Sequence, residues 1–399
     1  MPVPLSVNSQ LLVNHLQSLP ELDGRFTNIS LANYDPAHGK RGSFSLVFRA
    51  HDKVENRPIA LKFYDPDPRW SRDKYRQACF QREAEVLRSL VNVERCVQLV
   101  KPLDRYDLPV PISGAAGGAT ATISCDYFAL EWLDEKIDHY FLEQGKFDAL
   151  EKLALFNEIL LAIEALHRHQ VFHRDLKFDN FRAYTANGKR TVVAIDLGTA
   201  AKYSSGRLPS ASYPTGPVGH FFWASPEAIC GLASNRKLAP CCDRYALGCL
   251  LFELFNHDIC FRAIRSVTPD YDPRLSAMMS LVTSTASEEV QVAEWESGLK
   301  AFAPGVTPVP IDGAGTSVPP GIAPILGELV AGLTHIDFRR RFDLDTARRK
   351  VLTAITVLKN QRIYDRKLRQ RRELRRRRIQ KLEEKRKRLQ PRLPDAETK

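Results

Sequence analysis

The stretch at residues 173–180, HRDLKFDN, constrains this chain more than any other segment. It places a carboxylate at Asp175, a lysine two positions later at Lys177 and an amide at Asn180. An amphipathic pattern over residues 149–169 predicts a helix that leads into it. This order suits a loop that presents a carboxylate to a hydroxyl group and, five residues on, an oxygen ligand to a metal ion.

Two short apolar segments, 180–184 and 191–195, follow the loop and predict a β-hairpin. An Asn-Gly pair lies between them, and such a pair is typical of a tight turn because both of its residues tolerate positive φ angles. The hairpin brings Asn180 and Asp196 to the same end of the two strands. The sequence therefore predicts two oxygen ligands close to the Asp175 carboxylate.

A lysine and a glutamate lie upstream of this loop. In the predicted strand 59–64, Lys62 falls beside the small Ala60, on a face with space for a ligand. Residues 72–91 predict a helix, and Glu83 lies at the edge of its apolar stripe, where it can point towards the sheet. The neighbouring Glu85 is the rival assignment. The stripe consists of Phe80, Ala84, Leu87 and Val91.

Periodicity and composition predict the remaining elements. Segments rich in Pro, Gly, Ser or Ala predict loops at 109–122, 199–222 and 303–324. We expect a helix at 8–19, strands at 44–48, 97–103 and 125–133, a buried helix from 243, and helices at 286–301, 324–334 and 344–359.

Composition favours a soluble protein with reduced thiols. No apolar run approaches 18 residues, so we expect no transmembrane segment, and the first 20 residues lack the pattern of a secretory signal. The 8 cysteines include no C-x-x-C spacing. These features together predict a cytoplasmic location.

The positive net charge of +11 comes from one segment. Residues 361–392 contain 16 Lys and Arg against 4 Asp and Glu, and the remainder holds 42 basic and 43 acidic residues. We expect this tail either to bind an anionic partner (nucleic acid, a membrane surface or an acidic protein) or to be a solvated extension. Tyr364 is the one aromatic residue there, so base stacking is not implied.

These motifs, in this order, resemble those of the eukaryotic-type (Hanks-type) protein kinases, in particular the serine/threonine branch. The resemblance implies an α+β fold with two lobes, a small β-rich N-lobe and a larger helical C-lobe. We accordingly expect an N-terminal extension at 1–34, the N-lobe at 35–133, the C-lobe at 134–359 and a basic helical tail at 360–399.

The resemblance also implies a function and its residues. The chain would transfer the γ-phosphate of ATP to Ser/Thr hydroxyls of a protein substrate, with Asp175 as base and Mg²⁺ bound by Asn180 and Asp196. Lys62, paired with Glu83, would contact phosphates, and Lys177 would lie near the transferred group. The residues expected around ATP are Gly42, Val47, Ala60, Lys62, Glu131 and Leu133.

Structural residues of the family have counterparts as well. Residues 224–227, ASPE, resemble the A-P-E motif, and Arg341 resembles the arginine that pairs with its glutamate, here Glu227. Asp243 resembles the aspartate that tethers the catalytic loop. The A-P-E-like segment with its Arg341 partner, together with Lys177, disfavours a small-molecule kinase.

Four positions depart from the family pattern. The glycine-rich loop keeps only Gly42 of its three glycines, and the preceding Lys40 and Arg41 are either compensating cations or part of a solvated turn. Arg182 stands where the family usually has an apolar residue that forms the floor of the adenine site. Its guanidinium either stacks on the base or swings aside. Leu197 replaces phenylalanine in D-F-G, and His220 replaces a threonine. A pseudokinase that serves as a nucleotide-binding scaffold is therefore the alternative.

Arg174 predicts phosphorylation of the following loop. An arginine before the catalytic aspartate often binds a phosphate on that loop. The candidate hydroxyls are Ser204, Ser205, Ser210, Ser212, Tyr213 and Thr215.

Overall fold

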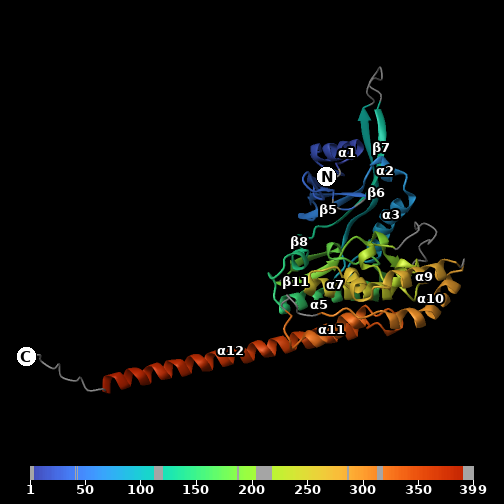
Figure 1. The fold of residues 1–399 in the computed structure, drawn as a ribbon. Coiled ribbons are helices and arrows are strands. Elements are labelled where there is room, and N and C mark those ends of the chain that lie inside the picture. The colour runs from blue at the N-terminus through green and yellow to red at the C-terminus, as the bar shows by residue number, and fades with distance from the viewer. Residues whose placement is uncertain are drawn as a thin grey trace, which may run out of the picture.

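The protein folds into two lobes, from which one long helix projects (Figure 1). The computed structural model describes residues 4–40, 42, 44–111, 120–186, 188–203, 218–284, 287–311 and 318–389. A small lobe built on a β-sheet lies above a larger, mostly helical lobe (Figure 1). The predicted α+β, two-lobed fold with a helical tail is thereby confirmed.

An antiparallel sheet of five strands forms the small lobe. Its order is β1 (Phe26–Leu31), β4 (Ser45–Asp52), β5 (Arg57–Tyr64), β7 (Thr120–Glu131) and β6 (Leu99–Pro111). A short hairpin of β2 (Tyr34–Asp35) and β3 (Gly39–Lys40) precedes β4. On the central strand β5, Lys62 pairs in register with Val47 on one side and Phe128 on the other.

The two faces of this sheet belong to different cores, because side chains alternate along each strand. Phe63 stacks on Tyr127, with ring centroids 4.6 Å apart, on the face covered by α1 (Val7–Ser18). Phe128 packs on Phe80 of α3 (Lys74–Ser89) on the other face. A short helix, α2 (Pro68–Ser71), precedes α3.

The sheet extends beyond the boundaries that we predicted. Strand β1 and helix α1 pack into the small lobe, so the lobe reaches into the segment 1–34 that we expected to be an extension. The predicted loop at 109–122 is partly wrong, because Pro109 pairs with Thr122 in the β6–β7 ladder. Val91 is 44% exposed rather than part of the apolar stripe, since α3 ends at Ser89.

Asp65 joins α1 to the hairpin before β4. Its Oδ1 accepts a hydrogen bond from the Ser9 hydroxyl at 2.6 Å, and both side chains are buried. Its Oδ2 forms an ion pair with the Lys40 ammonium of β3. The Lys40 side chain is therefore held against the sheet rather than in a solvated turn, whereas Arg41 lies outside the described residues.

The larger lobe is organised on two buried helices, α5 (Ala149–Arg168) and α7 (Ala239–Asn256). A capping box between Asp148 and Glu151 fixes the start of α5. The other helices of this lobe are α4 (His139–Leu142), α6 (Pro226–Ile229), α8 (Cys260–Val267), α9 (Tyr271–Thr283), α10 (Glu288–Phe302) and α11 (Ala323–Leu333). The sequence patterns missed α8 and α9.

Short strands surround the predicted catalytic loop. The predicted hairpin forms as β10 (Phe181–Ala186) and β11 (Lys189–Ala194), with β8 (Glu135–Lys136) on the outer side of β10. Strand β9 (Val171–Phe172) pairs with β12 (Ala201–Lys202). These strands hold the loop at the boundary between the two lobes (Figure 1).

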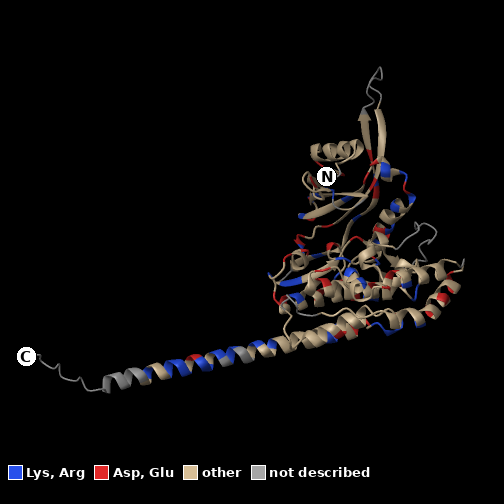
Figure 2. Cartoon of the chain, viewed as in Figure 1, with Lys and Arg blue, Asp and Glu red and all other residues tan. Residues whose placement is uncertain are grey.

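Helix α12 (Leu344–Leu389) is 46 residues long, about 69 Å at the usual rise per residue. Ala347, Val351, Ala354 and Leu358 are buried against the large lobe. The helix then leaves the lobe without a break at residue 360, and Lys and Arg cover the projecting part (Figure 2). None of the helices among the described residues combines the length and apolar composition needed to cross a membrane.

Candidate active site

A buried aspartate on α7 fixes the backbone of the catalytic loop. The Asp243 carboxylate accepts hydrogen bonds from the His173 N–H at 2.8 Å and the Arg174 N–H at 2.7 Å. His167, on the last turn of α5, binds the same carboxylate at 2.8 Å. Arg174 adopts a positive φ of 65°, a conformation that such anchoring can maintain. The tether predicted for Asp243 is thus present, and His167 is an additional anchor that the sequence patterns missed.

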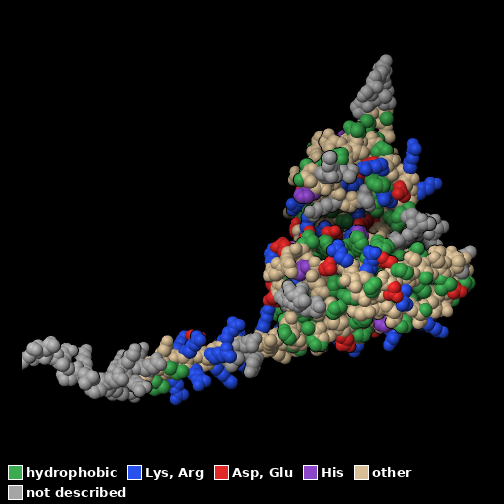
Figure 3. Space-filling model, viewed as in Figure 1, with side chains coloured by type: hydrophobic (Ala, Val, Ile, Leu, Met, Phe, Trp, Pro, Cys, Tyr) green, Lys and Arg blue, Asp and Glu red, His purple; other side chains and the backbone are tan. Residues whose placement is uncertain are grey.

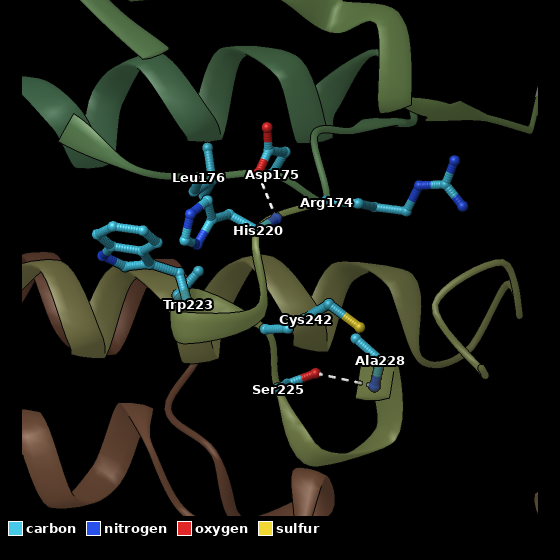
Figure 4. A pocket seen from close by; sticks show the side chains of 10 residues that line it. Arg174, Asp175, Leu176, His220, Trp223, Ser225, Ala228 and Cys242 are labelled. Atoms are coloured by element: carbon cyan, nitrogen blue, oxygen red, sulfur yellow. Dashed lines mark hydrogen bonds between the residues drawn. The ribbon is translucent and has the colours of Figure 1, made fainter. Parts of the chain in front are cut away.

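Asp175 lies where the loop and the segment before α6 meet. Its Oδ1 accepts a hydrogen bond from the His220 N–H at 2.7 Å (Figure 4). Its Oδ2 lies 3.2 Å from Nδ2 of Asn180 and 3.5 Å from the Lys177 ammonium. The structure therefore brings together three predicted site residues, with one carboxylate oxygen held by backbone and the other facing polar side chains.

Gly219 permits this contact, and no sequence pattern had indicated a role for this glycine. The residue has φ +83°, and a Cβ there would lie 2.4 Å from the Arg174 carbonyl oxygen and 3.0 Å from the Asp175 Cα. Any larger residue would push the catalytic loop away. The one sequence feature that could have indicated this role is the position of the glycine, directly before the unusual His220.

Asn180 and Asp196 lie at the same end of the β10–β11 hairpin. The Ile195 N–H donates to the Asn180 carbonyl at 2.9 Å, and this bond places Asn180 beside Asp196, the residue after Ile195. The Asn180 amide nitrogen donates to the Asp175 carbonyl at 2.8 Å, which leaves its Oδ1 for another ligand. Asp196 adopts a left-handed conformation, and its side chain is 45% exposed.

These two side chains fit magnesium. An amide oxygen and a carboxylate are hard ligands, and Mg²⁺ usually takes one or two protein ligands and completes its shell with water and phosphate oxygens. Within the described ranges, no group of three or more His, Cys, Asp or Glu side chains could hold a metal by itself. The site therefore suits an ion that arrives with a phosphate ligand.

Lys62 connects the two lobes electrostatically. Its ammonium lies 2.7 Å from Oε2 of Glu83 and 3.1 Å from Oδ1 of Asp196. Burial would lower the pKa of Lys62, but the Asp196 and Glu83 carboxylates together raise it. Burial raises the pKa of Glu83, whereas Lys62 lowers the pKa of Asp196. The structure thus pairs Lys62 with Glu83 and not with the alternative Glu85, which is exposed.

The residues expected around ATP lie on the small lobe and on the segment that leaves it. Gly42 has φ +86° and open space at its Cβ position. Val47 and Ala60 come from adjacent strands, β4 and β5, and Ala60 is buried. Glu131 ends β7, and its carboxylate accepts a hydrogen bond from the Gln98 N–H at 2.8 Å. Leu133 follows it and is half-buried. Figure 3 shows a hollow between the two lobes at this level.

Arg174 and Arg182 both donate hydrogen bonds to neighbouring groups, mainly backbone carbonyls. Arg174 donates from Nε to the Thr199 carbonyl at 2.7 Å and from Nη1 to the Ser234 hydroxyl at 3.0 Å. Arg182 donates from Nη1 to the carbonyls of Asp179 and Phe181, at 2.9 and 2.7 Å. The candidate phosphorylation sites of the following loop lie outside the described residues; they are Ser204, Ser205, Ser210, Ser212, Tyr213 and Thr215.

A small pocket opens beside Asp175 (Figure 4). The rings of His220 and Trp223 line it, with centroids 4.7 Å apart, together with Ser225 and Cys242. Below it, Glu227 forms the predicted ion pair with Arg341 at 2.5 Å, and both side chains are fully buried. This pair ties α6 to the segment before α12.

The sequence of this chain is similar to those of known proteins. The protein kinase domain family matches residues 39–350. A probable serine/threonine-protein kinase of Streptomyces coelicolor is 28% identical over 217 residues, which are 54% of this chain and 29% of that protein. Serine/threonine-protein kinase PrkC of Bacillus subtilis is 27% identical over 224 residues, 55% and 30%. Serine/threonine-protein kinase 36 of Pongo abelii is 26% identical over 213 residues, 53% and 14%. The chain spans less than a third of the length of each of these relatives.

Proposed function

This chain belongs to the protein kinase family, and we propose that it transfers the γ-phosphate of ATP to serine or threonine hydroxyls of protein substrates. One observation carries the proposal: Lys62, Asp175, Asn180 and Asp196 converge from separate segments. Lys62 lies 3.1 Å from Asp196, and Asn180 lies 3.2 Å from Asp175. The three relatives above are all named as serine/threonine-protein kinases, which supports this choice of acceptor.

Asp175 would act on the acceptor hydroxyl. Its Oδ1 is occupied by the His220 N–H, so the hydroxyl proton would move to Oδ2. Lys177, 3.5 Å from Oδ2, would lie close to the group being transferred and offset its negative charge. The His220 N–H would hold the carboxylate orientation while the proton moves.

Asn180 and Asp196 would hold Mg²⁺ through the amide Oδ1 and the carboxylate. When bound, the ion neutralises charge that develops on the phosphate oxygens. Lys62 would turn from Asp196 towards the phosphates, and Glu83 would keep it oriented. The adenine would lie under Val47 and Ala60, which would form an apolar lid, with Glu131 and Leu133 at the edge and Gly42 over the phosphates.

Label transfer tests this proposal. The protein would be incubated with labelled ATP, Mg²⁺ and a generic protein acceptor, beside Asp175→Asn and Asp196→Asn. We expect the transfer rate of each variant to be lower by a factor of roughly 10²–10⁴, the usual contribution of a general base or charge-stabilising group. Asp179→Asn is the matched control, because Asp179 is an exposed carboxylate of the same loop. Equal activity in all four proteins would contradict the proposed roles.

A nucleotide-binding pseudokinase is the second candidate. The loss of two loop glycines and the presence of Arg182 favour it, because both alter the nucleotide site. It predicts that ATP raises the melting temperature while no label is transferred. Transfer by the unaltered protein that Asp175→Asn abolishes would exclude this candidate.

We also propose a cytoplasmic location. All eight cysteines are unpaired and buried, which suits a reducing compartment. Fractionation of cells that express the protein, followed by immunoblotting, would test it. Recovery from a secreted or membrane fraction would contradict it.

The basic segment 361–392 would bind an anionic partner. Its excess of basic residues is the source of the positive net charge of the chain. The described side chains between residues 361 and 382 are all exposed, so the charges are accessible.

A further inference from the structure

The projecting part of α12 is an isolated, strongly basic helix. Residues 359–382 contain nine Arg and three Lys against one Asp and one Glu. Of these cations, Arg362 is paired with Asp148 of the large lobe, and Arg377 lies 2.6 Å from Glu373. The others form no ion pair with another described side chain. The segment therefore carries a dense positive charge that the described part of the protein does not neutralise.

Cations lie all round the helix, and two groups of them occupy opposite sides. At 100° per residue, Lys367, Arg371, Arg375 and Arg378 follow one another at spacings of 4, 4 and 3 and form one stripe, here called stripe A. A second stripe, stripe B, lies about half a turn away and consists of Arg366, Arg369 and Arg376. All seven side chains are exposed. Figure 3 shows basic side chains along both edges of the projecting helix.

This distribution disfavours a membrane surface. A helix that lies on a bilayer needs one continuous apolar face opposite its charges. Here Leu374, Ile379 and Leu382 share a side with stripe A, so cations interrupt the apolar positions. Immersing that face would carry several guanidinium groups into the acyl region.

Arginine content and helix shape favour duplex nucleic acid. Guanidinium groups bind phosphate bidentately, and Arg outnumbers Lys nine to three. The B-form major groove, about 12 Å wide, admits an α-helix between two walls of phosphates, whereas the A-form major groove is too narrow for one. The scarcity of aromatic residues argues against single strands, which bind mainly by stacking.

We propose that α12, over residues 366–381, binds in the major groove of duplex DNA, with stripes A and B contacting the phosphates of opposite walls. Glutamine and arginine are the polar side chains available to base edges there, so binding depends mainly on the backbone and little on sequence. The inference does not depend on the proposed kinase reaction, since it needs neither ATP nor the catalytic loop.

Fluorescence anisotropy with the full chain and a labelled DNA duplex of about 20 base pairs, two helical turns, tests the proposal. One variant replaces the four residues of stripe A with Gln, and a second replaces the three of stripe B. The control replaces four exposed cations of the two lobes with Gln: Lys53, Arg88, Lys189 and Arg262. Helicity and the thermal unfolding midpoint, both by circular dichroism, confirm that each variant is folded.

We expect each stripe variant to bind DNA at least tenfold more weakly, and the control to bind like the unaltered protein. The slope of log K against log salt should fall by about 3 to 4 for stripe A and by about 2 to 3 for stripe B, near 0.9 for each phosphate that the protein no longer neutralises. If only one of the two stripe variants bound DNA more weakly, the partner would contact one side of the helix, and the proposed groove geometry would be wrong.

Three competitors test whether the segment prefers another class of anionic partner. Duplex RNA of the same sequence, vesicles containing phosphatidylserine, and poly-glutamate are titrated against the labelled DNA complex. The proposal predicts that unlabelled duplex DNA displaces the probe at the lowest concentration. Stronger displacement by any of the three, loss of binding in the control variant, or no binding at low salt would overturn it.

Discussion

Two buried ion pairs, one in each lobe, each join a glutamate to a basic side chain, but the basic group and its surroundings differ. Lys62–Glu83 lies in the small lobe and Arg341–Glu227 in the large lobe. Arg341 makes two bonds to Glu227, at 2.5 and 2.9 Å, and also donates to the carbonyls of His335 and Cys241. Lys62 instead divides its ammonium between Glu83 and the partly exposed Asp196.

The difference separates a structural pair from an exchangeable one. All five N–H donors of a guanidinium lie in a fixed plane, so the saturated Arg341 cannot change partners without losing several bonds. An ammonium is a compact charge on a flexible stem, and one partner of Lys62 faces solvent. We therefore expect the large-lobe pair to control stability and the small-lobe pair to control activity.

The largest effect should follow from breaking the saturated pair. Glu227→Gln leaves the Arg341 charge buried without a counter-ion, and we expect the free energy of unfolding to fall by about 3–5 kcal/mol. Urea denaturation measures it as a lower midpoint with an unchanged slope. Glu373→Gln is the control, because Glu373 forms an exposed pair with Arg377 and its loss should cost under about 0.5 kcal/mol. A similar small cost for both would remove the distinction between the two pairs.

The second prediction concerns Lys62. Lys62→Met should reduce label transfer about 10²–10³-fold, because a preorganised charge next to the phosphates is lost. Its unfolding midpoint should change less than that of Glu227→Gln. Lys53→Met, on an exposed lysine of the same lobe, should leave the rate unchanged. Full activity of Lys62→Met would show that the small-lobe pair is structural as well.

Gly219 links the catalytic loop to the large-lobe pair. The chain runs from this glycine through His220, which contacts Asp175, to Glu227. Gly219→Ala should lower both stability, by about 1–3 kcal/mol, and the transfer rate, because its Cβ would overlap the catalytic loop. Gly231→Ala is a matched control, with the same φ of +83° and no atom within 4 Å of its Cβ. Equal effects would assign the whole cost to backbone strain.

The smallest effect is a pH dependence of the small-lobe pair. Burial raises the pKa of Glu83 to about 7, from 4.5 in an exposed carboxyl. Only ionised Glu83 attracts Lys62, so the transfer rate should fall about tenfold for each pH unit below 7. Stability has the opposite sign: the contribution of this carboxyl is full below pH 4.5 and is lost as the pH rises to 7. Glu83→Gln should remove both trends, and their persistence in that variant would contradict the assignment to Glu83.

Local sequence patterns predicted the parts of the site that depend on order along the chain. The alternation around Lys62, the helical edge position of Glu83 and the Asn-Gly hairpin placed their residues where the structure has them. Contacts between distant segments were not predictable in this way. The His220 N–H on Asp175 and the fit of Gly219 against Arg174 arise from packing of two segments some 45 residues apart, and backbone donors leave no compositional trace. Helix α1 was recognised, but nothing in its sequence indicated that Ser9 would bind Asp65.

Asp65 makes the position of α1 and the position of the glycine loop interdependent. One carboxylate serves Ser9 of α1 with one oxygen and Lys40, at the base of the loop, with the other. If a nucleotide phosphate drew Lys40 away, Asp65 would keep its hydrogen bonds from Ser9 and the Asp67 N–H but lose its counter-ion, and the free energy with which α1 packs on the sheet would change. Coupling of this kind is reciprocal, so loosening of α1 must change nucleotide affinity by the same factor.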